Sequence, residues 1–181
     1  MSKLLQPLAA IFLALLHVSC TGFDKDAALA RADTRFEDGD FDGAISDYSR
    51  VLREEPENVR ALNNRGVARL RTGDAQGAIL DFDAALIHQP FFAEALCNRG
   101  LARFQLEHLD RAIDDYSAAI GQQPRYAKAW AARGIARSKK GDLGGAAGDF
   151  KAALDVAPAE WPDRKAVEAE LAKLQKAGEG K

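Results

Sequence analysis

Prolines recur along this chain at a constant interval of 34 residues. Three further columns keep the same interval: an alanine, an aromatic residue four positions after it, and a glycine. The four columns are Pro56, Pro90, Pro124 and Pro158; Ala44, Ala78, Ala112 and Ala146; Tyr48, Phe82, Tyr116 and Phe150; and Gly66, Gly100 and Gly134. A fixed period of this length predicts a fold built from stacked copies of one supersecondary unit.

The period divides residues 25–160 into four units, 25–58, 59–92, 93–126 and 127–160, and each unit predicts two helices. In unit two the first helix ends at Thr72-Gly73-Asp74, where glycine can adopt the left-handed conformation and aspartate can cap the next helix. The second helix must end before the proline. Unit three has Glu107-His108 instead, so we expect its turn to be strained by about 1 kcal/mol if the geometry is kept.

The second helices carry apolar residues at helical spacing, such as Ala112, Tyr116 and Ala119, on one face. A single unit cannot bury this face, so an all-α stack with capped ends is expected. Residues 161–177 place Val167 and Leu171 on one face and predict a capping helix for the last unit. Residues 178–181 are expected to fray.

These columns resemble the tetratricopeptide repeat family, in which a glycine lies in the first helix, an alanine and an aromatic residue in the second, and a proline closes the unit. The resemblance covers residues 25–160. It implies a right-handed α-solenoid of four helix-turn-helix units plus a C-terminal capping helix. Two family positions differ, because arginines replace the usual leucine before the glycine and tyrosine after it. These arginines are Arg65 and Arg69, Arg99 and Arg103, and Arg133 and Arg137, with Arg31 and Arg35 in the first copy.

Each arginine pair has a matching aspartate immediately before the aromatic residue of the second helix. The aspartates are Asp47, Asp81, Asp115 and Asp149. Opposite charges repeated in register favour an ion-pair ladder between packed helices. The alternative is that the arginines face a groove and bind an acidic ligand.

Residues 1–20 lie outside the repeat. Lys3 precedes an apolar run that is too short to span a membrane and is typical of a secretory signal. Cys20 lies where a bacterial lipoprotein carries its lipid, and residues 21–24 would form a tether. Ordinary signal cleavage and an uncleaved anchor are the alternatives, since His17 departs from the lipoprotein pattern. We expect an exported, lipid-anchored envelope protein that faces the periplasm, at the outer membrane if the host is diderm.

The sequence contains no constellation of nucleophile, base and cofactor motif, so no catalytic, cofactor-binding or metal-binding residues are predicted. The histidines lack the cysteine or carboxylate spacing of a metal site. A formal net charge of −2 gives no electrostatic reason to expect nucleic acid. An enzyme or small-ligand carrier has no supporting motif, so we expect the function to lie in a binding surface.

In the family that this chain resembles, the first helices line the concave side. The resemblance therefore implies a peptide-binding groove with an apolar centre, although some of its side chains could instead pack against the next unit. The implied groove residues are Asn63, Asn64, Val67, Leu70, Arg71, Asn98, Leu101, Phe104, Lys128 and Ile135. Among them, Asn64 and Asn98 would hold a peptide backbone, because an amide both donates and accepts hydrogen bonds.

The first copy is acidic, with Asp33 and Glu37, whereas the last is basic, with Lys128, Lys139 and Lys140. A peptide with apolar anchors and the opposite charge asymmetry would fit such a groove.

We therefore expect a non-enzymatic scaffold or adaptor of the bacterial envelope that binds a protein segment in its groove. The alternative is a structural bridge or self-associating subunit that acts through its convex surface. The family's carboxylate clamp for chaperone tails needs lysine and arginine where this chain has Glu94 and Asn98, so chaperone recruitment is not expected.

Overall fold

The computed structural model describes residues 24–179, in which the regular elements are all α-helices. The helices are α2 (Lys25–Glu37), α3 (Phe41–Glu54), α4 (Val59–Arg71), α5 (Ala75–His88), α6 (Ala93–Gln105), α7 (Leu109–Gln122), α8 (Ala127–Lys140), α9 (Leu143–Val156) and α10 (Arg164–Glu179). The predicted signal sequence, residues 1–20, and the predicted lipidation site Cys20 lie outside the described residues.

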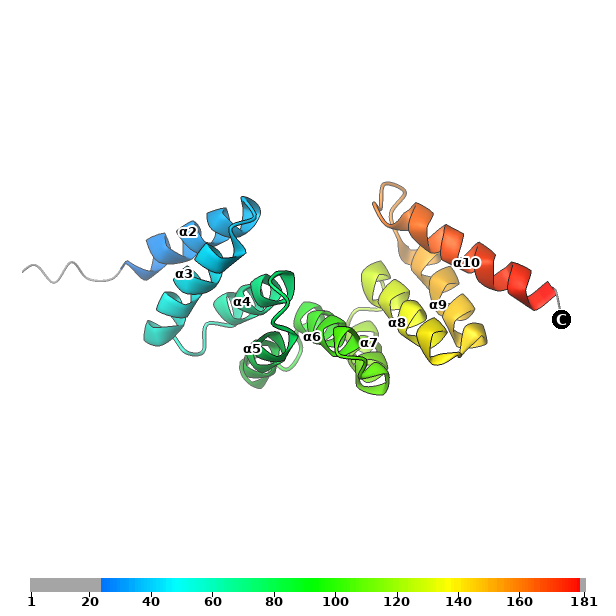
Figure 1. The fold of residues 1–181 in the computed structure, drawn as a ribbon, viewed down its shortest axis with the longest axis horizontal. Helices are drawn as coiled ribbons and strands as arrows, with labels where there is room; N and C mark the ends of the chain where they lie inside the picture. Colours follow the sequence, from blue (N-terminus) through cyan, green and yellow to red (C-terminus); the bar gives the residue numbers. More distant parts are fainter. Residues whose placement is uncertain (1–23, 180–181) are drawn as a thin grey trace, which may run out of the picture.

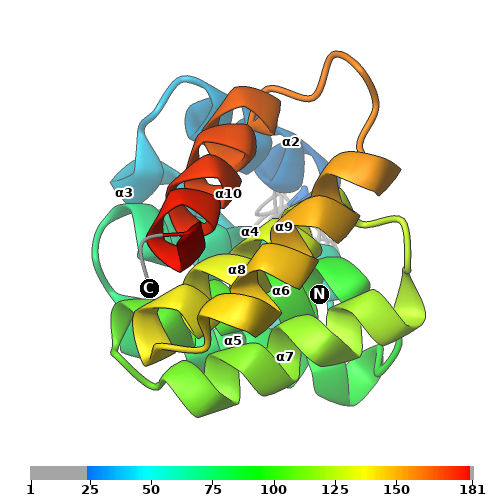
Figure 2. The ribbon, with the colours of Figure 1, turned by 90° about the vertical axis from the view of Figure 1, so that its right-hand side faces the viewer.

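Consecutive helices form antiparallel pairs, and the pairs stack side by side into an arc (Figure 1). The first helices α4, α6 and α8 lie toward the middle of the stack, and α5 and α7 lie at its edge (Figure 2). The last helix, α10, packs on α9 at the C-terminal end of the arc. The predicted all-α solenoid with a C-terminal capping helix is therefore confirmed.

The turn inside each unit reverses the chain through one residue with positive φ. Gly39, Gly73 and Gly141 have φ values of 81°, 87° and 91°, and Glu107 takes the same role in unit three at 62°. Among the described residues Glu107 is the sole non-glycine with positive φ. Unit three therefore keeps the turn geometry despite its different sequence, which meets the condition on which the strain of about 1 kcal/mol was predicted.

The glycine column lets two helices approach closely. A Cβ atom added to Gly66 would lie 2.7 Å from Cε1 of Phe82, and a Cβ on Gly100 would lie 2.7 Å from Cε1 of Tyr116. Gly134 has the same relation to Phe150. These rings are at most 1% exposed. The small residue of one helix and the ring of its neighbour therefore fill one space together, which explains why both columns repeat with the same period.

Hydrophobic burial is spread along the stack in several clusters of buried residues. The last cluster includes Phe150, Ala153 and Val167, and Leu171 packs against it. Arg164 at the start of α10 donates hydrogen bonds to the carbonyl oxygens of Leu154 and Ala157, at the end of α9. α10 therefore covers the apolar face that a fifth unit would otherwise bury.

Candidate functional site: the concave groove

The predicted ion-pair ladder joins the two helices of every unit and is confirmed. The Nη2–Oδ1 distances are 2.7 Å for Arg31–Asp47, 2.6 Å for Arg65–Asp81, 2.6 Å for Arg99–Asp115 and 2.8 Å for Arg133–Asp149. The second arginine of each unit, Arg35, Arg69, Arg103 or Arg137, lies within 3.2 Å of the same aspartate. The guanidinium groups that an acidic ligand would need are therefore already paired with aspartates of the fold, although those of Arg31 and Arg35 remain 45% and 40% exposed.

The ladder also joins neighbouring units. Nη1 of Arg65 donates to Ser49 Oγ at 3.1 Å, and Nη1 of Arg133 donates to Ser117 Oγ at 2.9 Å. In unit three the preceding second helix offers a carboxylate, and Arg99 Nη1 lies 2.5 Å from Asp83 Oδ1. Burial lowers the pKa of Arg99, but the hydrogen bonds to Asp115 and Asp83 outweigh it and the pKa is raised. The arginines thus fix the stacking of one unit on the next.

Three hollows follow one another along the first helices and together form the groove. The first, of about 240 Å³, lies between α2 and α4 and is lined by Asp33, Phe36 and Val67, among others. The second, also of about 240 Å³, lies between α4 and α6 and shares Val67 with the first. The third, of about 300 Å³, lies between α8 and α10 and shares Lys128 with the second. Because each hollow shares a lining residue with the next, the three hollows are neighbours along the first helices.

Eight of the ten residues that the sequence places in the groove line these hollows. They are Asn64, Val67, Leu70, Arg71, Asn98, Leu101, Lys128 and Ile135. The other two lie beneath or beside them. Asn63 is buried, and Phe104 packs into a core cluster with Lys139 Nζ 5.0 Å from its ring centroid.

The asparagines form a hydrogen-bonded row that crosses three units. Asn98 Nδ2 donates to Asn63 Oδ1 at 3.2 Å, Asn63 Nδ2 donates to Asn64 Oδ1 at 3.2 Å, and Asn64 Nδ2 donates to Asp33 Oδ1 at 3.3 Å. The row therefore supports the floor of the groove from within. Asn64 reaches the groove with part of its hydrogen-bonding capacity already used, whereas Asn98 is only 4% exposed and its amide donates to Asn63.

Asp33 lies at the end of this row and also accepts hydrogen bonds from two further side chains. Tyr48 Oη donates to Asp33 Oδ1 at 2.6 Å, and Arg60 pairs with Asp33 Oδ2. Burial, followed by the bond to Asp33, raises the pKa of Tyr48, so this hydroxyl stays protonated and remains a donor. Sequence reasoning missed the network, but a signal for it exists. Asn63 stands where the other units have Leu29, Cys97 and Ala131, and a polar residue in an apolar column needs a partner.

The charge of the groove is less asymmetric than the sequence suggests. Lys139 pairs with Glu107 of the α6–α7 turn, and Lys140 pairs with Asp110 in the first turn of α7. The hydrogen bond to Asp110 raises the pKa of Lys140. Lys128 lines both the second and the third hollow, so it is the basic residue of the last unit that meets the groove.

Apolar side chains are exposed at the centre and the C-terminal end of the groove. Leu101 and Ile135 are 36% and 46% exposed and belong to consecutive units at the same repeat position. The third hollow adds Trp161 and Val167 to Ile135. This arrangement offers two neighbouring apolar contact points, separated by Lys128.

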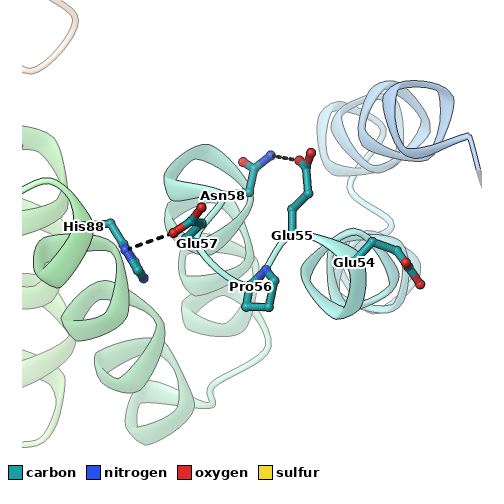
Figure 3. A pocket seen from close by; sticks show the side chains of 6 residues that line it. All are labelled: Glu54, Glu55, Pro56, Glu57, Asn58 and His88. Atoms are coloured by element: carbon teal, nitrogen blue, oxygen red, sulfur yellow. Dashed lines mark hydrogen bonds and ion pairs between the residues drawn. The ribbon is translucent and has the colours of Figure 1, made fainter.

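A further hollow lies outside the groove, at the turn between α3 and α4 (Figure 3). Glu55 accepts a hydrogen bond from Asn58 at 2.9 Å, and Glu57 lies 3.9 Å from His88 of α5. Glu55 also pairs with Lys25, and its hydrogen bonds to Lys25 and Asn58 lower its pKa. Glu55 and Glu57 therefore have partners among their neighbouring side chains. In residues 24–179 no group of three or more histidine, cysteine, aspartate or glutamate residues could hold a metal ion.

Cys97 is the one cysteine among the described residues and is 1% exposed. Burial raises the pKa of its thiol to about 11. A neutral, buried thiol is a packing residue and a poor nucleophile.

No helix within residues 24–179 is long and apolar enough to cross a membrane.

The tetratricopeptide repeat family model matches residues 29–95 and 97–177, so this chain belongs to the tetratricopeptide repeat family. The predicted family and the right-handed solenoid are confirmed. Members of this family act generally as protein-interaction scaffolds rather than enzymes. No curated protein matches the sequence.

Solved structures support the same fold. The crystal structure of MamA protein has 25% sequence identity and a TM-score of 0.70, and the alignment covers 84% of this chain and 88% of that one. The first tetratricopeptide domain of Spaghetti, bound to an HSP90 peptide, has 24% identity and a TM-score of 0.63. That alignment covers 65% of this chain and 93% of the Spaghetti domain. A tetratricopeptide repeat protein of Thermus thermophilus has 21% identity and a TM-score of 0.70, and the alignment covers 84% of this chain and 82% of that one.

Proposed function

We propose that this protein is a non-enzymatic adaptor that holds an extended segment of a partner protein in its concave groove. The observation that carries the proposal is the row of three neighbouring hollows from α2 to α10, in which each shares Val67 or Lys128 with the next. A row of hollows along several units suits an extended chain segment, whereas a small molecule favours a single cavity that buries most of its surface.

The groove residues define the chemistry of that segment. One apolar side chain would contact Val67 and Leu101, and a second would enter the hollow formed by Ile135 and Trp161. Lys128 between them favours an acidic residue between the two anchors. Toward α2, Glu37 and Glu94 line the first hollow and favour a basic residue.

We further propose that the adaptor acts at the bacterial cell envelope, attached by lipid on Cys20. The apolar run of residues 1–20, with its basic start and terminal cysteine, supports this placement. Mass spectrometry of the mature amino terminus tests it. A diacylglyceryl mass on Cys20, lost in Cys20→Ser, is the expected result, and an unmodified or uncleaved terminus would overturn the lipid anchor.

Site-specific photocrosslinking in living cells tests the groove. A photoreactive amino acid is placed at Leu101 or Ile135 of the full chain, and at the exposed Asp155 of α9 as a matched control. A discrete crosslinked partner is expected from the two groove positions and not from the control. Equal labelling at all three positions, or none at the groove positions, would contradict the proposal.

A further inference from the structure

α5, which lies on the outer side of the stack (Figure 1), carries a second set of exposed apolar residues. Leu80, Ile87 and Phe91 are 68%, 76% and 83% exposed, the highest values among the large hydrophobic residues of the described chain. Leu80 and Ile87 share one face of α5, two helical turns apart, and Phe91 follows the helix. We call these three residues the α5 strip.

The repeat shows that the fold does not require apolar residues at these positions. The equivalent residues are Ser46, Arg53 and Glu57 in unit one, Asp114, Gly121 and Arg125 in unit three, and Gly148, Asp155 and Ala159 in unit four. Unit two therefore differs from its neighbours at three positions together. Single exposed hydrophobic residues are ordinary on protein surfaces, but two on one helix face with a third just after that helix indicate a contact surface.

The charges beside the strip indicate what covers it. Glu57, Phe91 and Arg125 occupy the same position in units one, two and three. A two-fold axis parallel to α5 would lay unit one of one copy over unit three of another. The two Phe91 side chains would then meet at the axis. On each side of them, Glu57 of one copy would face Arg125 of the other. At the position of Phe91 the flanking charges are therefore complementary to themselves, as a two-fold interface requires.

We propose that this protein self-associates through the α5 strip, with unit two of one copy packed on unit two of the other. A lipid surface fits less well, because the flanks carry both signs of charge and anionic lipids attract clustered lysine and arginine. Two convex surfaces touch over a limited area, so the dimer is weak and depends on concentration. The grooves of both copies remain open, so one dimer presents two binding sites to a partner.

Sedimentation velocity of the purified full chain over a wide concentration range tests the proposal. The double variant Leu80→Glu with Ile87→Glu is expected to raise the dimer dissociation constant by about 10-fold or more, because each copy then buries charge. Gly148→Glu is the matched control, with the same new residue at the position equivalent to Leu80 in unit four, which faces no unit of the second copy, and should leave the constant unchanged. Both variants keep the native amino-terminal segment, so its contribution cancels in the comparison.

Charge reversal tests the symmetry. Glu57→Arg and Arg125→Glu should each weaken the dimer, and the two together should restore it. A monomer at every concentration, a dimer indifferent to the α5 variants, or reversals that do not compensate would each overturn the proposal. Failure here is distinct from failure of the groove, because crosslinking from Leu101 and Ile135 does not involve the α5 strip.

Discussion

The turns of units two and three follow the same backbone path with different residues. In unit two, Gly73 N donates to Leu70 O and Asp74 N donates to Arg69 O. In unit three, Glu107 N donates to Phe104 O and His108 N donates to Arg103 O, the same pattern shifted by one repeat.

The side chains of the two turns have little in common. Asp74 caps α5 by accepting a hydrogen bond from Gly77 N at 2.8 Å, whereas His108 makes no side-chain cap. Both units nevertheless share the arginine–aspartate ladder and the glycine beside a ring. The comparison teaches that the interior columns fix the shape of a unit, and that turn residues adjust its stability.

The ladder should show the largest effect, and the same one in both units. Asp115→Ala would leave Arg99 and Arg103 without their shared, 3% exposed partner, which costs about 3 kcal/mol of unfolding free energy. Asp81→Ala should cost a similar amount in unit two. Urea denaturation followed by circular dichroism measures both losses, and a double-mutant cycle with Arg99→Ala should show coupling. Additive single effects would show that the ladder does not hold the helices together.

The glycine beside the ring should matter next, again equally in both units. Gly66→Ala and Gly100→Ala would each force a methyl group against a buried ring and cost about 1–3 kcal/mol. Gly148→Ala is the control, since no atom lies within 4 Å of its added Cβ. It should stabilise α9 by up to about 1 kcal/mol. Thermal melts compare the three variants. Equal melting temperatures for Gly100→Ala and Gly148→Ala would refute the packing argument.

The turns should show a smaller effect, of opposite sign in the two units. Glu107→Gly should stabilise unit three by about 1 kcal/mol, because glycine adopts positive φ without strain. Gly73→Glu should destabilise unit two by a similar amount. The contact of Glu107 with Lys139 is exposed, so its loss offsets little of the gain. If Glu107→Gly lowers stability in urea titration, that contact outweighs the backbone strain.

Unit one offers a pH test of the same ladder. The hydrogen bond from Arg31 holds the pKa of Asp47 below its usual value, although burial opposes the shift. The ionised form is thus favoured in the folded state. Its contribution is present above the unfolded pKa near about 4 and is lost as the pH falls through the lower folded value. Asp47→Asn should flatten the acid limb of stability against pH, and an unchanged limb would exclude this pairing as its source.

Most of the fold could be predicted from the 34-residue period, because the glycine, the aromatic ring, the arginines and the aspartate recur from unit to unit together with the contacts that they make. The resemblance to the family, rather than the period, implied that Val67, Leu101 and Ile135 lie on the concave side, and these residues line the hollows there. Periodicity could not separate Asn63, which is buried, from Asn64, which lines the groove. Adjacent residues of a helix point about 100° apart, so the rotation of one unit on the next decides which is covered.

The contacts that long side chains make between units could likewise not be predicted from the sequence. Lys139 reaches Glu107 and covers Phe104, which removes both the lysine and the ring from the groove. The partner of a flexible side chain depends on the distance between units, and no local pattern records that distance.

The binding of selected peptides to the full chain tests the groove most directly. Peptides are selected from a random display library on wild-type protein, and their affinities are measured by fluorescence anisotropy against Leu101→Glu with Ile135→Glu and against Leu80→Glu with Ile87→Glu. We predict peptides with two spaced apolar anchors whose affinity falls at least about 10-fold with the groove pair and stays unchanged with the α5 pair, since a buried unpaired carboxylate costs more than about 1.4 kcal/mol. Peptides that bind the groove pair as tightly as wild type would contradict the account.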